Sequence, residues 1–295
     1  RLVHEKMPED QSLDMAQLIS LELAREVGSQ RFWRRQTARR LLVERGSIDK
    51  AALDTLVKWV REPQDKSGAI NALYTLDGLG QLTAEMVSSA LDSSEPGVRR
   101  HALRLAEKRF ALSESLLKVV VEMADDKSAM VRLQLALSLG ESTDPRATTA
   151  LAHLVIRYGD DDWLADAILS SLGGRAGQML LVLLDNEKDV AHLHSLIERL
   201  CVTIANRRNP KEFSVALIRV AKLKDVGLQR LCLRGFRESI KSTVRVSLNK
   251  PAKEALKSLT SVGDGKVQGE ALGLVRVLKL ESMAERKDRI NVAIK

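Results

Sequence analysis

The apolar positions of this chain recur with the period of an α-helix along most of its length. In residues 48–60, 113–124 and 212–223 they fall at i, i+3, i+4 and i+7, which gathers them on one helix face. The same pattern marks residues 13–27, 83–91, 147–158, 177–185, 191–205 and 251–262. Gly, Asp, Ser and Pro separate these stretches, as in "STDPR" and "NRRNP". The pattern predicts short amphipathic helices joined by turns.

Three further segments resemble one another at a fixed spacing. Residues 91–107, 124–141 and 158–174 align so that Val98 and Val131 are 33 residues apart, and the next copy follows at the same interval. Looser copies lie at 30–46, 66–80, 225–236 and 264–278. One helix pair cannot bury its apolar face alone, so successive pairs must stack on one another. The repeats therefore predict an all-α solenoid of about seven helix pairs.

Charged residues recur at matched positions in two of these copies. Asp92 comes seven residues before Arg99, and Asp125 comes seven residues before Arg132. On a helical wheel, Arg99 falls inside the apolar stripe that begins at Val98. An unpaired buried charge is costly, so we expect these arginines to pair with a turn aspartate of their own repeat or of the neighbouring one. In later copies Ala165, Gln229 and Gln268 replace the arginine.

The Asp-to-Arg spacing and the "VR" dipeptide that opens the second helix resemble the HEAT repeat, most clearly over residues 90–175. The resemblance implies a HEAT-like right-handed α-solenoid. It also implies that the recurring aspartates and arginines form a structural row of ion pairs between repeats, called the Asp–Arg ladder. We expect one solenoid domain over residues 1–295. Within it, residues 1–10 are expected to form a linker from a preceding domain, and residues 281–295 a charged C-terminal cap.

The stretch "RFWRRQTARRLLVERG", residues 31–46, carries six arginines and one tryptophan. On the wheel, the predicted buried face consists of Trp33, Thr37, Ala38, Leu41 and Leu42. Arg34 then falls at the angle of Arg99 and Arg132, which predicts a ladder arginine, while Arg35 and Arg39 flank the solvent side. This separation weakens the interpretation of the stretch as a nucleic-acid contact.

Five segments also resemble a particular group of HEAT proteins. These are "FWRRQTARRLLVERG", "NALYTLDGLG", "EPGVRRHALRLAE", "VRLQLALSLGE" and "DDDWLADAILSSL", in that order. Together they are similar to the HEAT-repeat region of the haem-binding (CxxCH) membrane-bound-dehydrogenase-like proteins of planctomycetes and verrucomicrobia, over residues 1–175. Those proteins join a β-propeller, a HEAT region and a c-type cytochrome domain. The resemblance implies a spacer or docking scaffold between redox modules, in a periplasmic or other extracytoplasmic location.

Composition agrees with helices and limits the chemistry. Hydrophobic residues make up 44% and aromatic residues only 3% of the chain, so Leu, Val, Ala and Ile must build the core. The chain has no run of about 18 apolar residues, so no membrane span is expected. Cys201 and Cys232 are predicted to be buried free thiols. The sequence has no C-x-x-C-H, so this segment is expected to hold no haem c, although the resembling proteins carry it.

Candidate catalytic and ligand-binding motifs favour structural interpretations. His192 and His194 point to different sides of a helix and make a poor metal pair. "YGDDDW" lacks the spacing of a calcium loop, so Asp161 or Asp162 is expected to cap a helix. "SLGGRAGQ" and "SVGDGKVQGEALG" do not fit a phosphate loop. We predict no catalytic residue, cofactor or metal site in this segment.

Two functions follow. The first is a non-catalytic scaffold that binds a protein partner or sibling domains on its concave face. The second is a solenoid that binds a nucleic-acid backbone, including a DNA glycosylase-like interpretation. The net charge of +8, the Trp33–Arg cluster and "IANRRNPK" support the second. A continuous basic face would favour nucleic acid.

Overall fold

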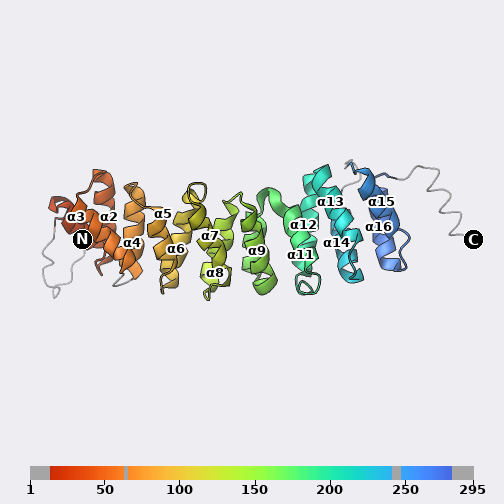
Figure 1. The fold of residues 1–295 in the computed structure, drawn as a ribbon, viewed down its shortest axis with the longest axis horizontal. Helices are drawn as coiled ribbons and strands as arrows, with labels where there is room; N and C mark the ends of the chain where they lie inside the picture. The colour runs from red at the N-terminus through yellow and green to blue at the C-terminus, as the bar shows by residue number, and fades with distance from the viewer. Residues whose placement is uncertain (1–13, 63–65, 241–246, 281–295) are drawn as a thin grey trace, which may run out of the picture. The chain divides into compact units, whose positions relative to one another are not determined.

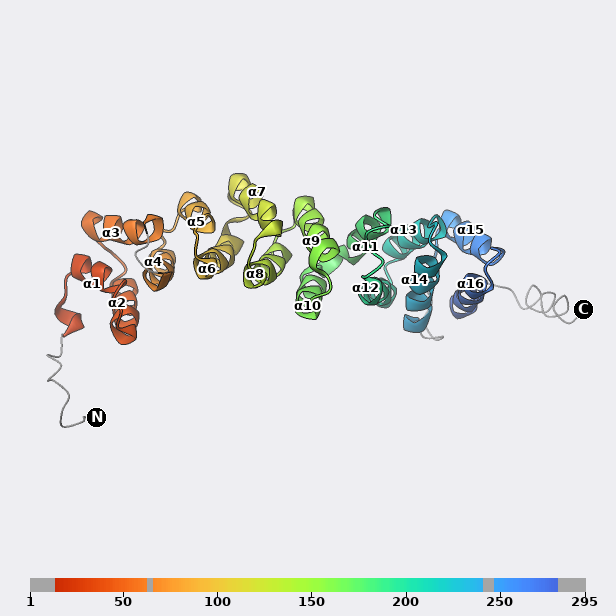
Figure 2. The same cartoon turned by 90° about the horizontal axis from the view of Figure 1, so that it is seen from below.

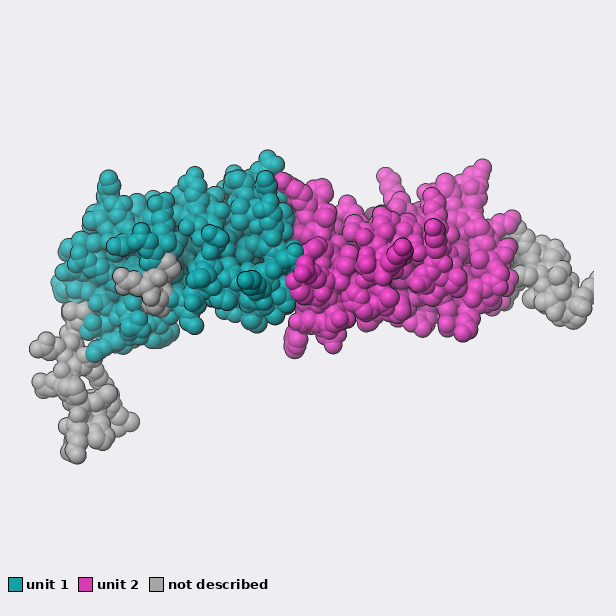
Figure 3. Space-filling model, turned by 60° about the horizontal axis from the view of Figure 1, so that its bottom comes forward, with its two compact units in different colours: residues 1–138 teal, residues 139–295 magenta. Residues whose placement is uncertain are grey.

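The computed structural model describes residues 14–62, 66–240 and 247–280, and their regular structure is entirely helical (Figure 1). The helical fold predicted from the apolar pattern is confirmed. The expected linker, residues 1–10, and the expected cap, residues 281–295, lie outside the described residues. The chain divides into two compact units, residues 1–138 and 139–295, coloured separately in Figure 3. Each is described by itself, and the single-domain prediction stays a prediction.

Unit 1 contains four helix pairs, the last of which ends two residues beyond the boundary at residue 138. Their bounds are α1 Ser20–Glu26 with α2 Phe32–Arg45, α3 Lys50–Arg61 with α4 Lys66–Gly78, α5 Ala84–Leu91 with α6 Pro96–Ala106, and α7 Glu114–Glu122 with α8 Ala129–Gly140. Short 3-10 turns precede or follow them: η1 Met15–Gln17, η2 Glu107–Arg109 and η3 Met123–Asp125. The first helices of the pairs pack side by side as one layer, the A layer, and the second helices form the B layer (Figure 2).

Unit 2 repeats this arrangement. Its pairs are α9 Pro145–Tyr158 with α10 Asp162–Ser171, α11 Ala176–Asp185 with α12 His194–Arg207, α13 Pro210–Ala221 with α14 Val226–Ser239, and α15 Lys250–Leu259 with α16 Gly265–Val277. The 3-10 turn η4, Gly173–Arg175, joins α10 to α11. The described residues thus hold eight pairs. About seven pairs were expected, because residues 177–185 and 191–205 were not recognised as a repeat of their own. In the structure these residues form α11 and α12, which pack on each other as an additional pair.

Local sequence explains where the helices start. Side chains of Asp49, Thr83, Ser113, Asp161, Asn209, Asp225, Asn249 and Asp264 accept hydrogen bonds from backbone N–H groups of the first turn. Asp161 accepts from Trp163 N at 3.0 Å and from Leu164 N at 3.3 Å, so the predicted helix cap is confirmed. Pro96, at the start of α6, has no N–H group that would need a partner there.

The core lies between the two layers of each unit. It consists mainly of Leu, Ala and Val, as the composition predicted. In unit 2, the fully buried rings of Phe213 and Phe236 meet edge to face with centroids 4.9 Å apart, which fixes α13 against α14. Cys201 and Cys232 are both buried and free, as predicted. Burial raises the pKa of the Cys201 thiol well above its ordinary value.

By length and composition, no single described helix could cross a membrane, although the bent pair 162–171 and 173–185 passes that test when taken together.

Candidate functional site

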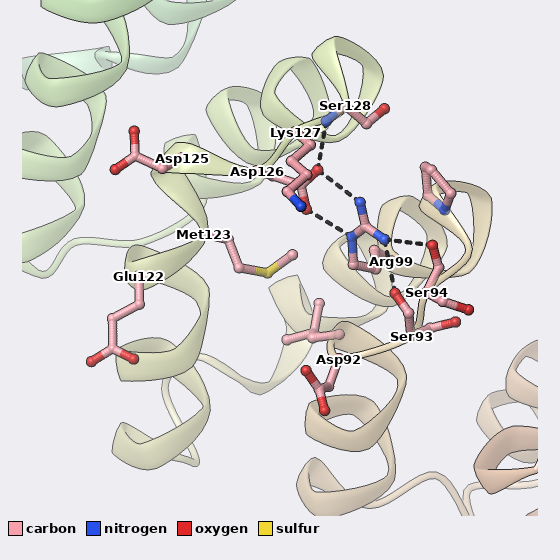
Figure 4. Close-up of a pocket in the computed structure, with 12 residues that line it drawn as sticks. Asp92, Ser93, Ser94, Arg99, Glu122, Met123, Asp125, Asp126, Lys127 and Ser128 are labelled. Atoms are coloured by element: carbon pink, nitrogen blue, oxygen red, sulfur yellow. Dashed lines mark hydrogen bonds and ion pairs between the residues drawn. The ribbon is translucent and has the colours of Figure 1, made fainter.

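Arg99 joins two turns of unit 1 (Figure 4). Its Nε and Nη2 donate to the two carboxylate oxygens of Asp126 at 2.7 and 2.8 Å, a bidentate ion pair. Its Nη1 donates to the carbonyl oxygens of Ser93 at 2.8 Å and Ser94 at 3.1 Å. The side chains of Arg99 and Asp126 are only 14% and 8% exposed. Arg99 therefore fastens the α5–α6 turn to the α7–α8 turn.

The electrostatics of Asp126 agree with this pairing. Burial by itself raises the pKa of the Asp126 carboxyl, but the hydrogen bonds from Arg99 and from the Ser128 N–H, with the nearby charges of Arg99 and Arg132, outweigh it. The net result is a pKa below the usual value. The carboxylate form is thus the one that the folded state stabilises, as expected for a structural ion pair.

The partner of Arg99 differs from the predicted one by a single residue. Asp126 forms the ion pair, whereas Asp125 points away from Arg99 and Asp92 ends α5 as an exposed residue (Figure 4). The reason lies in the turn: Asp126 also accepts the Ser128 N–H at 2.8 Å, an Asx-type contact that turns its carboxylate toward Arg99. For Arg99, the partner is thus a turn aspartate of the neighbouring repeat, as expected, but it is Asp126 rather than Asp125.

A similar one-residue shift affects α2. Arg35, Arg99 and Arg132 are each the fourth residue of their helix and donate through Nη1 to carbonyls of the preceding turn. Arg35 donates to Ser29 at 2.8 Å and to Gln30 at 3.0 Å. Arg34 instead lies 3.7 Å from a Glu26 carboxylate oxygen. The ladder position of α2 therefore belongs to Arg35, not Arg34.

The shift has a clear physical origin. The buried face of α2 is centred on Ala38 and Leu42, and the residue that corresponds to Val98 of α6 is Arg34. Because α2 lacks an apolar residue there, the sequence suggested Trp33 as the packing anchor. Trp33 is 44% exposed, so this part of the predicted buried face is wrong.

Two glutamines occupy the same fourth position in unit 2. Gln229 Nε2 donates to the Val220 carbonyl at 3.1 Å, and Gln268 Nε2 donates to the Thr260 carbonyl at 2.9 Å. Both carbonyls belong to the end of the preceding helix or its turn. The sequence predicts that these glutamines are positions where the ladder arginine is lost. In the structure each glutamine still donates a hydrogen bond to a carbonyl of the preceding helix end or turn, as the arginines do, but without their positive charge.

A second set of arginines was missed from the sequence. They lie at or just after the ends of second helices and donate to carbonyls near the second helix of the preceding repeat. Arg109 Nη2 donates to Leu82 O at 3.2 Å and to Asp77 Oδ1 at 2.7 Å, and Arg175 Nη2 donates to Leu139 O at 3.1 Å. Cations favour the electronegative C-terminal ends of helices. An alignment of helix ends, rather than helix starts, would have shown them.

A hollow of about 830 Å³ in unit 1 lies beside the Arg99–Asp126 pair (Figure 4). Carboxylates of Asp92, Glu122 and Asp125 line it together with Lys127. Across the part of the chain that the structure describes, no group of three or more His, Cys, Asp or Glu residues could hold a metal ion. The hollow is thus bounded on one side by the Arg99–Asp126 ion pair, and its carboxylates do not form a group that could hold a metal ion.

The B layer of unit 1 is linked by a row of side-chain hydrogen bonds. Gln36 of α2 donates to Asn71 of α4 at 3.1 Å. The Tyr74 hydroxyl of α4 lies 3.0 Å from His101 Nδ1 of α6, and Ser138 of α8 donates to Glu107 after α6 at 2.7 Å. These links place the outward faces of α2, α4, α6 and α8 beside one another.

Three arginines of this layer, Arg39, Arg100 and Arg104, surround the Tyr74–His101 contact and are called the arginine cluster. The Arg39 guanidinium lies 5.1 Å from the centroid of the Tyr74 ring, a cation–π distance. Arg100 Nη2 lies 3.5 Å from His101 Nε2. Among the described residues, no carboxylate lies within ion-pair distance of any member of the cluster.

The cluster affects the ionisation of its neighbours. Burial, together with the positive charges of Arg100 and Arg104, lowers the pKa of His101 below its ordinary value. Burial raises the pKa of Tyr74, and the charges of Arg104 and Arg39 act in the opposite direction. His101 is therefore a neutral hydrogen-bonding residue near pH 7 in a positively charged setting.

An apolar stripe, Met130, Leu133 and Leu137, runs along α8 in the same layer. Met130 is 53% exposed, Leu137 is 43% exposed, and Leu133 is half-buried. They occupy the second, fifth and ninth positions of α8, and Arg100 and Arg104 occupy the fifth and ninth positions of α6. The arginine cluster and the apolar stripe therefore belong to equivalent faces of neighbouring helices.

The B layer of unit 2 is linked differently, by ion pairs. Arg199 of α12 lies 2.6 Å from Asp166 of α10, and Arg234 of α14 donates to both carboxylate oxygens of Glu198 at 2.6 and 2.9 Å. Arg237 of α14 donates to Glu270 of α16 at 2.7 Å. The helix-to-helix arginines of this layer are thus neutralised by the protein itself.

The basic motif "IANRRNPK" also contains structural residues. Arg207 donates to the Gly173 carbonyl and lies 3.3 Å from a Glu212 carboxylate oxygen. Arg208 ends α12 with a left-handed backbone, φ 57°. One of the three observations that favoured nucleic acid therefore has, in part, a structural explanation.

Residues 83–173 match the family model of HEAT repeats. This stretch contains the first two of the best-aligned repeat copies, all but the last residue of the third, and the Arg99–Asp126 pair. The predicted resemblance to HEAT repeats is confirmed there. No match to a curated protein was found.

Comparison with known structures found matches at low sequence identity. A homology model of the full-length AP-3 complex in an intermediate open conformation is 14% identical, with a TM-score of 0.45, and the match covers 93% of this chain and 53% of that chain. Kap121p bound to Ste12p is 13% identical, with a TM-score of 0.46, over 88% of this chain and 33% of that chain. The chain thus spans about half and about a third of the length of these two proteins.

Proposed function

We propose that this chain is a non-catalytic scaffold that binds a protein partner or a sibling domain through the B layer of unit 1. The observation that carries the proposal is the apolar stripe on α8, which is exposed beside the arginine cluster. Contiguous exposed apolar side chains on a folded protein mark interaction surfaces. Met, Tyr and Arg are also the residue types enriched in protein–protein interfaces.

The state of the titratable groups supports a structural rather than catalytic role for unit 1. The carboxylates with lowered pKa values are held by arginines: Asp126 by Arg99, and Asp77 by Arg109. For Asp77, burial raises the pKa, while the hydrogen bonds and charges of Arg109 and Lys108 lower it by more. A general base would instead need access to a substrate proton.

We further propose that the scaffold is a segment of a larger membrane-bound-dehydrogenase-like, c-type cytochrome protein, outside the cytoplasm. The five ordered segments between residues 32 and 172 support this proposal. It predicts that the gene for this chain also encodes a β-propeller and a C-x-x-C-H cytochrome module. A gene that encodes neither would contradict this finer proposal and leave the scaffold itself unaffected.

Site-specific photo-crosslinking in the producing cell tests the scaffold proposal. A benzoylphenylalanine at position 137, in the apolar stripe, is expected to crosslink to one discrete protein. The control is the same probe at position 112, because Leu112 is 85% exposed but lies outside the B layer. Equal labelling from both positions, or none from position 137, would contradict the proposal.

A nucleic-acid backbone is the second candidate, and the arginine cluster around Tyr74 favours it. A gel shift with duplex DNA tests it, because phosphate contacts weaken steeply as salt rises. Binding at about 50 mM salt that is lost at about 200 mM salt would support this candidate. The scaffold proposal predicts no shift at either concentration.

A further inference from the structure

We propose that the B layer of unit 1 recognises an acidic protein segment that also presents apolar side chains. The inference rests on the proposed scaffold function and specifies the chemistry of its partner. The partner's carboxylates would meet the arginine cluster on α2 and α6. Its apolar side chains would cover the stripe on α8.

The charge of the surface supports the acidic half of the partner. Arg39, Arg100 and Arg104 come from two helices, yet all three act electrostatically on the single Tyr74–His101 contact. Of the two nearby carboxylates, Asp77 is neutralised by Arg109 and Lys108, whereas Glu107 accepts from the neutral Ser138 and keeps its charge. The three cations outnumber this one charged carboxylate, and among the described residues none of them forms an ion pair, so the cluster attracts an anionic ligand. Planar guanidinium groups suit carboxylates in particular.

The arrangement of α6 and α8 supports the apolar half. Glu107, one turn after Arg104, accepts from Ser138, the neighbour of Leu137, so the two helices are held side by side at this level. The fifth and ninth residues of α6 are Arg100 and Arg104, whereas the fifth and ninth residues of α8 are Leu133 and Leu137. A single extended or helical segment that crosses both helices would therefore meet cations first and aliphatic side chains next.

The same arrangement disfavours a nucleic-acid strand. Duplex DNA carries one negative charge per about 1.7 Å of its axis, so its backbone favours cations that continue along the path. On α8 the outward second, fifth and ninth positions are Met130, Leu133 and Leu137, and none of these is cationic. The positive surface ends at α6, where a phosphate backbone would next meet aliphatic side chains.

The test uses the full chain and a fluorescein-labelled peptide designed with glutamates and leucines on one helical face. Binding is measured by fluorescence anisotropy at about 150 mM salt, where distant surface charges are screened. Two further peptides separate the contributions: one replaces every Glu with Gln, and the other replaces every Leu with Ser. A labelled DNA duplex is titrated in parallel.

The decisive protein variant is Arg100→Glu with Arg104→Glu. Neither arginine has a carboxylate partner among the described residues, so the fold should tolerate the change, and circular dichroism with a thermal melt checks this. The matched control is Lys58→Glu with Arg61→Glu, which alters the charge equally on two exposed residues of α3 in the A layer of the same unit. A milder pair, Arg100→Gln with Arg104→Gln, replaces the first variant if that one misfolds.

The expected result is binding that weakens at least about tenfold in the B-layer variant and with either altered peptide, and that is unchanged in the A-layer control. Three results would overturn the inference: no binding by the wild-type chain, equal loss in both variants, or tighter binding of DNA through the same arginines. If the peptide fails but position 137 still crosslinks to a protein, the scaffold function stands and only the acidic partner is wrong.

Discussion

The two units build the same surface with different chemistry. In the B layer of unit 1, neutral hydrogen bonds link the outward faces of α2, α4 and α6, and the ion pairs of Asp77 with Arg109 and Lys108 lie where α4 and α6 end. Among the described residues, no member of the arginine cluster has a carboxylate partner. In the B layer of unit 2, the corresponding links are arginine–carboxylate pairs, such as Arg234 with Glu198. The helical scaffold is thus compatible with either solution. An arginine is available to a partner only where the neighbouring helix does not supply a carboxylate to pair with it. The number of arginines in a layer therefore does not by itself show where a partner could bind.

The largest expected effect is at the joint of unit 1. Arg99→Ala removes a mostly buried guanidinium and leaves the Asp126 carboxylate without its bidentate partner. We expect the free energy of unfolding to fall by about 3 kcal/mol, as is usual when one member of a buried pair is removed. Urea denaturation followed by circular dichroism measures it.

The matched control for that change is Arg199→Ala in unit 2. The Arg199–Asp166 pair is half exposed on both sides, at 50% and 57%, so solvent screens it. Its loss should cost less than about 1 kcal/mol. If both variants lowered the free energy of unfolding equally, the Arg99–Asp126 pair would stabilise the fold no more than an exposed ion pair. That result would contradict the structural role proposed for the ladder.

A smaller loss of stability is expected in unit 2, where a glutamine occupies the position of the ladder arginine. Gln229 is buried, and its side chain donates to the Val220 carbonyl. Gln229→Leu keeps a similar volume but removes the donor, so we expect a loss of about 1 kcal/mol. A thermal melt that matches the wild-type chain would mean that the glutamine only fills space and does not replace the ladder arginine.

The smallest effect is on a proton equilibrium. Because the His101 pKa is lowered in the fold, its contribution to stability is present above the unfolded value of about 6.5 and is lost as the pH falls through the folded pKa. Arg104→Gln removes one of the charges that act on the ring, so the His101 pKa should rise toward its usual value. NMR titration of the His101 ring protons in both proteins checks this, and an unchanged pKa would show that the charge of Arg104 does not contribute to the shift.

The sequence predicted the helical architecture well because the apolar period and the turn residues are local signals. The match to HEAT repeats over residues 83–173 and the buried thiols of Cys201 and Cys232 followed from the same patterns. The register of single residues was harder. Arg99 pairs with Asp126 rather than with Asp92 or Asp125, because the turn directs the Asp126 carboxylate toward it. In α2, which lacks an apolar anchor, Arg35 rather than Arg34 donates to the carbonyls of the preceding turn.

The candidate surface could not be predicted from periodicity. A wheel placed Arg39 toward solvent but could not show that Tyr74, His101 and Arg104 meet it from two other helices. The exposed stripe on α8 likewise looks like an ordinary apolar helix in the sequence. Only the packing of α6 beside α8 shows that Leu137 lies outside the core.

The most direct measurement is methyl NMR of the full chain labelled at its methionines, during titration with the acidic, leucine-bearing peptide. Met130 lies in the apolar stripe of unit 1, and Met179, fully buried in unit 2, is an internal reference. We predict that the Met130 methyl signal shifts and broadens while that of Met179 stays unchanged. A Met130 signal that does not respond at peptide saturation would contradict the claim that the B layer of unit 1 is the binding surface.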